Sequence, residues 1–167
     1  DRASGKLATA LTPASFREQR SFTPTHSILY FINKDDPRGA IPSNPTDDPQ
    51  FENWEKAVQA YVAAHSIVGG TEPPREFDDL HVPQNQPTVR VLSPGDNATI
   101  SGFLNVSVEA SAPRGINRVE YWIDERPFAT QNYAPYSLNQ SLPSDLPGGF
   151  HKLTAKAFDD IENSAEV

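Results

Sequence analysis

The chain has 167 residues, a formal net charge of −8, no cysteine and no methionine. The acidic balance argues against nucleic acid and anionic lipid as partners, because both require a basic surface. The missing cysteine excludes disulfides and thiolate metal sites.

No apolar run reaches the length of a membrane span, and no signal-peptide pattern opens the sequence. Because the first residue is not methionine, we interpret the chain as a processed or excised piece of a longer protein. Any membrane anchor or export signal is then expected upstream of residue 1. We expect no membrane insertion by the residues given.

Residues 1–85 are predicted to form an extension and linker with local structure only. The apolar run SILYFIN predicts a short strand near residues 27–33. A proline-rich stretch follows, which favours turns and extended chain. A helix is predicted near residues 49–64, with Asp48 as its N-cap and Pro49 at its first helical position.

The predicted helix has one apolar face, and Gly69 and Gly70 are expected to end the element. Its members recur at helical spacing: Phe51, Trp54, Val58, Tyr61 and Val62. One amphipathic helix is not stable alone in water, so it must dock on another surface. The sequence leaves open whether that surface belongs to the following module or to a catalytic domain upstream.

Residues 86–167 change to the alternating pattern of half-buried strands. The alternation is clearest over residues 88–92, 104–110, 116–123 and 152–158, with turn residues between these runs. Six or seven such strands predict a mainly β fold: an antiparallel Ig-like β-sandwich preceded by a Pro-rich extension with one amphipathic helix. The expected inward residues include Val106, Val119, Tyr121 and Ile123.

Four motifs in this region occur in a fixed order: PTVRVLSPGDNATISG, VEYWID, APYS and GFHKLTAKAFD. Together they resemble the bacterial Ig-like domains appended to cell-wall and polysaccharide-active proteins. That family usually has glycine in two turns where this chain has Glu125 and Glu162. Glycine adopts positive φ most readily, so we expect both turns to depart from tight hairpin geometry. The last strand has barely begun at Val167, so we expect the module to be truncated there.

The first region is similar to a different group of proteins. ASGKLATALTP looks like the segment just past the transpeptidase core of penicillin-binding proteins. HSILYFINKDDPRG and DPQFENWEKAVQAY, within residues 1–62, are similar to the tail of bifunctional penicillin-binding proteins. The resemblance implies the C-terminal extension of a peptidoglycan glycosyltransferase and D,D-transpeptidase. It also implies an extracytoplasmic location in the cell envelope and an upstream catalytic domain as the partner within the same chain.

No catalytic residue is predicted in these residues. Penicillin-binding acylation needs a Ser-x-x-Lys sequence, which places a lysine one helical turn from the nucleophile. The residues three positions before the five lysines are Ala3, Phe31, Asn53, Gly149 and Leu153, so no such sequence exists. Lys-Thr-Gly is also absent. We expect no cofactor and no enzymatic activity from the chain itself.

Two functional hypotheses follow, and Trp122 and Tyr133 separate them. The chain is either a non-catalytic accessory spacer that contacts peptidoglycan or a cell-envelope protein, or a carbohydrate-binding module. Carbohydrate binding needs exposed aromatic rings, because sugars stack their apolar faces on them. Trp122 is out of phase with the inward residues of its strand and is the first candidate, and Tyr133 is the second.

No metal site is predicted. Asp159, Asp160 and Glu162 are the one acidic group dense enough to suggest calcium, which takes six to eight oxygen ligands. Turn capping and solubility explain the same residues more simply. The four histidines are scattered without the spacing of zinc ligands.

Overall fold

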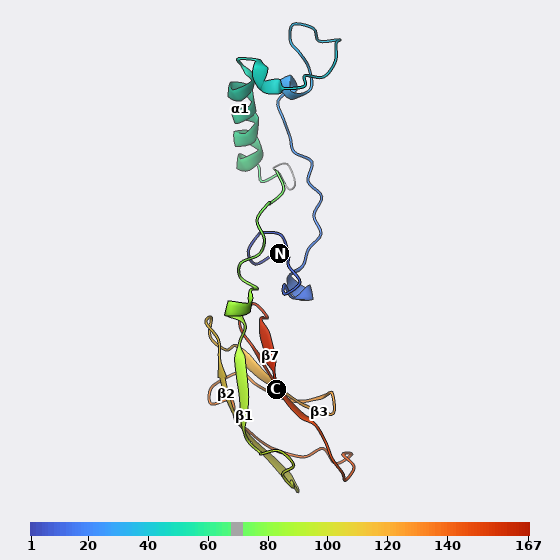
Figure 1. Cartoon of the computed structure of the whole chain (residues 1–167), viewed down its shortest axis with the longest axis vertical. Coiled ribbons are helices and arrows are strands. Elements are labelled where there is room, and N and C mark those ends of the chain that lie inside the picture. Colours follow the sequence, from blue (N-terminus) through green and yellow to red (C-terminus); the bar gives the residue numbers. More distant parts are fainter. Residues whose placement is uncertain (68–71) are drawn as a thin grey trace. The chain divides into compact units, whose positions relative to one another are not determined.

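The computed structural model describes residues 1–67 and 72–167 (Figure 1). The chain divides into two compact parts. We call residues 1–17 with 76–167 the sandwich unit and residues 18–75 the helix unit. Within the described residues, no helix has the length and apolar character needed to cross a membrane. The predicted helix end at Gly69 and Gly70 lies outside the described residues.

The sandwich unit contains two antiparallel sheets, and the described residues place seven strands in them. The three-stranded sheet has the order β1-β2-β5, with β1 at Thr88–Ser93, β2 at Phe103–Ser111 and β5 at Leu138–Ser141. The four-stranded sheet has the order β4-β3-β6-β7, with β3 at Arg118–Ile123, β4 at Arg126–Gln131, β6 at Leu153–Phe158 and β7 at Ser164–Glu166. The predicted mainly β, antiparallel fold is confirmed.

Alternate residues of both sheets meet in one hydrophobic core, because successive side chains of a strand point to opposite faces. The buried members are Leu104, Val106, Val119, Tyr121, Ile123, Leu138, Ala155 and Ala157. Each fully buried Val, Leu or Ile contributes roughly 1.5–3 kcal/mol relative to exposure. The inward phase predicted for Val106, Val119, Tyr121 and Ile123 is confirmed.

Phe158 is a buried ring on the outer face of the four-stranded sheet. Its position on β6 is out of phase with the core residues Ala155 and Ala157. The guanidinium carbon of Arg118, the residue opposite it on β3, lies 3.9 Å from the ring centroid. This cation–π contact covers the phenyl ring and explains why an outward residue is buried.

Two tyrosines close one end of the sandwich. The Tyr121 hydroxyl donates to the carbonyl of Tyr136, and the Tyr136 hydroxyl donates to the carbonyl of Ile116 at 2.9 Å. Burial raises the pKa of Tyr121 to about 12. Tyr121 is therefore a core ring, and Tyr136 of the APYS motif is a structural residue at the rim.

The expected departure from tight turns is wrong. Asp124 and Glu125 both adopt positive φ, at 49° and 67°, as a two-residue hairpin turn requires. Glu162 does the same at 65°. Hydrogen bonds to neighbouring residues hold these conformations in place. The Asp124 carboxylate accepts from the Lys152 nitrogen at 2.8 Å, and two nitrogens of Arg118 donate to the Glu162 carboxylate.

The helix unit is built around α1, Phe51–Ala64. The helix begins two residues later than Pro49, so the predicted cap is displaced. Asp48 nevertheless ties down the entry to the helix, because its carboxylate accepts from the Gln50 nitrogen at 2.8 Å. Gln50 occupies the N-cap position without a side-chain cap.

The strand predicted near residues 27–33 is wrong. A 3-10 helix spans Ile28–Tyr30 instead. The Glu55 carboxylate of α1 accepts from the Ser27 nitrogen at 2.9 Å, and Leu29 is buried. The segment has no strand partner among the described residues, so its backbone groups pair locally and with α1.

Only part of the predicted apolar helix face is packed within the helix unit. Val62 is buried, and Phe51 and Val58 are half-buried. Trp54 and Tyr61 remain 52% and 58% exposed. The expected docking face therefore divides into a packed stripe and an exposed stripe.

Candidate functional site

Trp122 lines a groove beside the β3–β4 pair. The groove has a volume of about 370 Å³ and lies over β3 and β4. Its lining residues are Glu120, Tyr121, Trp122, Pro127, Phe128, Ala129 and Thr130. The pairing of β3 with β4 shifts register between Tyr121 and Trp122. The extra residue is Phe128 on β4, and such a bulge increases the local twist of the strand that carries it.

The Trp122 indole nitrogen is buried and has no hydrogen-bond partner among the described residues. Buried N–H groups in folded proteins are nearly always bonded, and an unpaired one costs roughly 1–3 kcal/mol. The Trp122 ring as a whole is only half-buried. The Trp122 indole N–H is therefore an unsatisfied donor inside the fold, while part of the ring is exposed.

Tyr133 lies away from this groove. Its side chain is 83% exposed, and it follows the end of β4 at Gln131. Trp122 pairs with Pro127 near the other end of β4, four residues earlier, which corresponds to roughly 13 Å of strand. The structure thus does not bring Trp122 and Tyr133 together on one platform.

The three acidic residues of the turn after β6 point to different partners. Asp159 is fully buried and accepts from the Ile161 nitrogen and from the backbone and side-chain nitrogens of Asn163. Asp160 accepts two hydrogen bonds from Arg114, each 2.7 Å long. Glu162 accepts two from Arg118, each 2.8 Å long.

Electrostatics agree with this division of partners. The hydrogen bonds from Arg114 hold the pKa of Asp160 below its ordinary value, and those from Arg118 do the same for the pKa of Glu162. Each of the three carboxylates already accepts hydrogen bonds from other groups of the protein, and those of Asp160 and Glu162 are paired with an arginine. The three residues cap and brace the turn and do not form one set of cation ligands.

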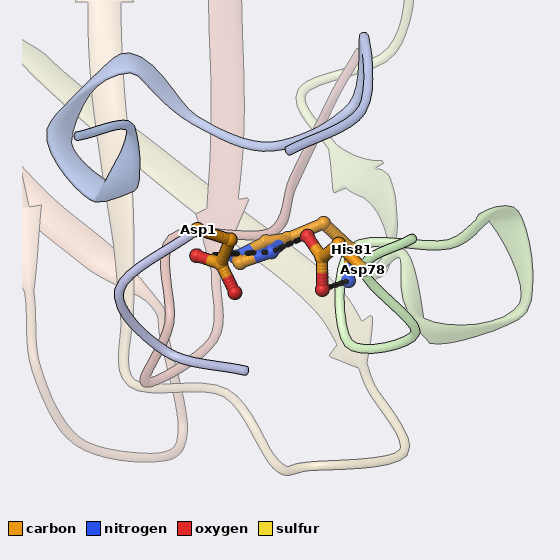
Figure 2. Close-up of side chains that lie close together, drawn as sticks. All are labelled: Asp1, Asp78 and His81. Atoms are coloured by element: carbon orange, nitrogen blue, oxygen red, sulfur yellow. Dashed lines mark hydrogen bonds and ion pairs between the residues drawn. The ribbon is translucent and has the colours of Figure 1, made fainter. Parts of the chain in front are cut away.

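A different cluster of Asp1, Asp78 and His81 is buried in the sandwich unit (Figure 2). His81 Nδ1 lies 2.5 Å from an Asp78 oxygen and 3.9 Å from an Asp1 oxygen. His81 Nε2 lies 3.1 Å from the carbonyl of Ile161 in the turn after β6. The cluster therefore joins the first residue, the segment before β1 and the β6–β7 turn.

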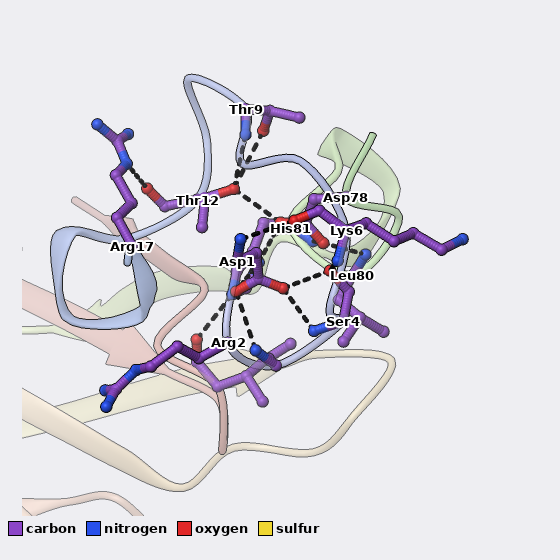
Figure 3. Close-up of polar contacts among 12 residues, drawn as sticks. Asp1, Arg2, Ser4, Lys6, Thr9, Thr12, Arg17, Asp78, Leu80 and His81 are labelled. Atoms are coloured by element: carbon purple, nitrogen blue, oxygen red, sulfur yellow. Dashed lines mark hydrogen bonds and ion pairs between the residues drawn. The ribbon is translucent and has the colours of Figure 1, made fainter. Parts of the chain in front are cut away.

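Further hydrogen bonds surround this cluster (Figure 3). Asp78 accepts from the Thr12 hydroxyl at 2.7 Å and from the Leu80 nitrogen at 2.9 Å. Burial by itself raises the pKa of Asp78, but the hydrogen bonds from Thr12, Leu80 and His81 prevail and hold this pKa below its usual range. We call the network of Thr12, Asp78, His81 and the Ile161 carbonyl the cap network.

The cap network does not fit a metal ion in this arrangement. Zn²⁺ binds nitrogen and oxygen at about 2.0–2.2 Å with tetrahedral angles, which keeps two ligand atoms about 3.3 Å apart. His81 Nδ1 and the Asp78 oxygen are only 2.5 Å apart, so no ion fits between them. The Asp1 oxygens already accept from Ala3 and Ser4. The cluster is a closed hydrogen-bond network.

Sequence reasoning missed this cluster for a clear reason. Thr12 and Asp78 are 66 residues apart, and His81 and Ile161 are 80 apart. Neither segment carries a periodic apolar pattern, and residues 76–86 contain one proline and mostly polar side chains. The one local signal is the spacing of Asp78 and His81, which is too common to identify a buried pair.

Comparison with known proteins identifies the sandwich. The family described as bacterial Ig domain matches residues 87–155. Fibronectin(III)-like modules of Clostridium thermocellum CbhA are a similar solved structure, at 26% identity and a TM-score of 0.42, over 48% of this chain and 42% of that one. No curated protein matches. Residues 87–155 thus form a bacterial Ig-like domain, and the cap network attaches the preceding segment to it.

Proposed function

We propose that this chain is a non-catalytic, extracytoplasmic spacer region of a peptidoglycan-synthesising penicillin-binding protein. The resemblance of residues 1–62 to the tail of such proteins supports the choice of parent. The Ig-like domain supports an accessory role, because such domains are generally non-catalytic and usually stand on cell surfaces. The upstream catalytic domain of the same chain is its first partner, and peptidoglycan or a cell-envelope protein is the second.

The cap network is the observation that carries the spacer role. A spacer holds its distal end in place only if the chain entering it is rigidly attached. Residues 1–17 enter the sandwich unit through a buried hydrogen-bond network and through a parallel bridge between Leu7 and Phe77. The Leu7 nitrogen donates to Glu76 at 2.9 Å, and the Asp78 nitrogen donates to Leu7 at 2.8 Å. The entry is therefore built into the fold.

Residual dipolar couplings test this role directly. In a weakly aligned sample of the chain, the amide couplings of residues 2–12 and those of β3 should fit one alignment tensor, because the two segments belong to one rigid body. Two different tensors would mean that the entry moves freely, and the spacer proposal would fail.

A labelling experiment tests the non-catalytic part of the proposal. The purified chain should take up no fluorescent penicillin, since it lacks the Ser-x-x-Lys nucleophile. A complete penicillin-binding protein in the same gel serves as the positive control. Covalent labelling of this chain at a serine would overturn the assignment.

Carbohydrate binding is the second candidate function, and the partly exposed ring of Trp122 beside the groove favours it. Retention on insoluble peptidoglycan should fall on Trp122→Ala, which removes the ring and the donor. Trp122→Phe keeps one aromatic ring for stacking and removes the N–H together with the second ring of the indole, so retention should fall less than in Trp122→Ala. Tyr133→Ala is the matched control for an exposed ring outside the groove. Equal retention of all four proteins would exclude the Trp122 groove as the site.

A further inference from the structure

His151 joins two turns at the end of the sandwich opposite the cap network. It lies in the connection between β5 and β6, just before β6 begins. Its Nδ1 lies 2.5 Å from a carboxylate oxygen of Asp124, in the β3–β4 turn. Its Nε2 lies 2.8 Å from the carbonyl oxygen of Pro147, within its own connection. The ring therefore bridges two segments.

Both ring nitrogens of His151 face acceptors. A carboxylate oxygen and a carbonyl oxygen cannot donate, so both nitrogens must carry hydrogen for both contacts to be hydrogen bonds. This is the imidazolium form. The pKa of His151 is raised above its ordinary value. The hydrogen bond to the Asp124 carboxylate is the larger cause, and the hydrogen bond to the Pro147 carbonyl is the next. The His151 hydrogen bond in turn lowers the pKa of Asp124.

The segment closed by this ring carries an exposed aromatic side chain. Gly148, Gly149 and Phe150 lie between the two bonded residues, and the φ of Gly149 is +150°. Phe150 is 95% exposed. Two glycines leave this tip with few backbone restraints of its own. The bond from His151 to Pro147 therefore supplies a restraint that the local sequence lacks.

Neighbouring residues on the same two segments make further contacts. Arg126, at the start of β4, pairs with Asp145 at 3.1 Å. Lys152 contributes its backbone nitrogen to Asp124 at 2.8 Å. Glu125 completes the hairpin turn. The Arg126–Asp145 pair keeps its charges across the pH range in which histidine titrates, so it holds the base of the connection while His151 changes state.

We propose that His151, Asp124 and the Pro147 carbonyl form a pH-sensitive clamp that orders the Gly148–Phe150 tip and so controls how Phe150 is presented. In the imidazolium form, Nε2 donates to Pro147 and the tip is held. When Nε2 loses its proton, its lone pair faces the carbonyl oxygen and the bond is lost. His151 Nδ1 keeps its hydrogen and still donates it to the Asp124 carboxylate, so the base of the connection remains in place.

The sign of the pH dependence follows from the raised pKa of His151. The clamp is fully formed below about pH 6.5, the ordinary pKa of histidine. It is lost as the pH rises through the higher pKa that His151 has in the folded chain. Acidic to neutral conditions therefore order the tip, and alkaline conditions release it.

An NMR titration of the full chain between about pH 5 and pH 9 tests the clamp. The ring signals of His151 should titrate with a midpoint above about 6.5. The heteronuclear NOE of the Gly148–Phe150 amides should fall over the same interval. The amides of β3 should keep their NOE throughout and so report that the sandwich remains folded.

Three variants complete the test. Asp124→Asn should lower the His151 midpoint, and His151→Ala, which removes both ring donors, should leave the tip mobile at every pH. His65→Ala is the matched control, since His65 belongs to the helix unit and bonds to Tyr61. A His151 midpoint at or below the ordinary value would overturn the proposal. So would tip amides whose NOE does not change through the His151 transition.

Discussion

The sandwich unit and the helix unit differ in how their polar groups are used. In the sandwich unit, Asp78, His81 and Asp159 are buried, and each bonds to residues on other segments or across a turn. In the helix unit, Glu55 binds Ser27 and His26 but keeps partial contact with solvent. Long-range burial makes the first unit cooperative, whereas the second depends on one helix and a short packed segment.

Apolar burial shows the same contrast. The sandwich unit has a continuous core of residues from both sheets. Among the described residues of the helix unit, Leu29 and Val62 are the buried apolar side chains, while Trp54 and Tyr61 face solvent. A unit with so little burial has a low free energy of local unfolding. We therefore expect the two units to respond differently to mutation and to acid.

The largest expected effect comes from Asp78→Ala. Removing the buried Asp78 carboxylate leaves Thr12, the Leu80 nitrogen and His81 without their hydrogen-bond partner, which costs about 3–5 kcal/mol. Urea unfolding followed by near-ultraviolet circular dichroism should show a decrease of about that size in the stability of the sandwich unit. Glu55→Ala, the corresponding change in the helix unit, should leave this transition unchanged. Equal effects of the two variants would remove the distinction between the units.

Acid should remove part of the same stabilisation. The pKa of Asp78 is lower in the folded chain than in the unfolded chain, so its contribution is fully present above about pH 4. It is lost as the pH falls through the folded value. Thermal unfolding of the wild-type chain should show a midpoint that falls on acidification. In Asp78→Asn that fall should be smaller, and an identical fall would exclude Asp78 as its source.

A matched pair of valines compares the two cores. Val119 and Val62 are both buried, the first on β3 and the second on α1. Val119→Ala should lower the stability of the sandwich unit by about 2–3 kcal/mol, from lost burial and the cavity that remains. Val62→Ala should change amide exchange only within the helix unit. Altered exchange in β3 of the Val62 variant would show that the units unfold together.

The smallest expected effect is a stabilisation at Glu125. A side chain in the left-handed region costs roughly 1–2 kcal/mol, which glycine avoids at some cost in chain entropy. Glu125→Gly should therefore raise stability by up to about 1 kcal/mol. Glu162→Gly should bring no gain, because it also removes the hydrogen bonds from Arg118. Thermal unfolding of both variants measures the difference.

The core of the sandwich could be predicted because alternation reports burial directly. Val106, Val119 and Tyr121 face inward as their phase requires. Phase also placed Trp122 on the outer face, but it could not show the register shift beside it or the unpaired indole nitrogen. Those features depend on how two strands meet, which a single strand pattern does not contain.

Other features could not be predicted for the same physical reason. Residues 76–86 have the composition of a linker, yet Asp78 and His81 are buried by contacts with distant residues. The apolar run at residues 27–33 has the composition of a strand, yet no partner strand exists in the described helix unit and it forms a 3-10 turn. Composition predicts local preference, and long-range partners decide the outcome.

Pro127 lies on β4, an outer strand of the four-stranded sheet, beside the register shift at Trp122. Proline has no N–H to offer a neighbouring chain, and a bulge bends the strand away from straight pairing. The exposed edge at this point is therefore a poor template for adding a further strand. Copies of the domain crowded together can remain separate molecules instead of joining edge to edge into aggregates.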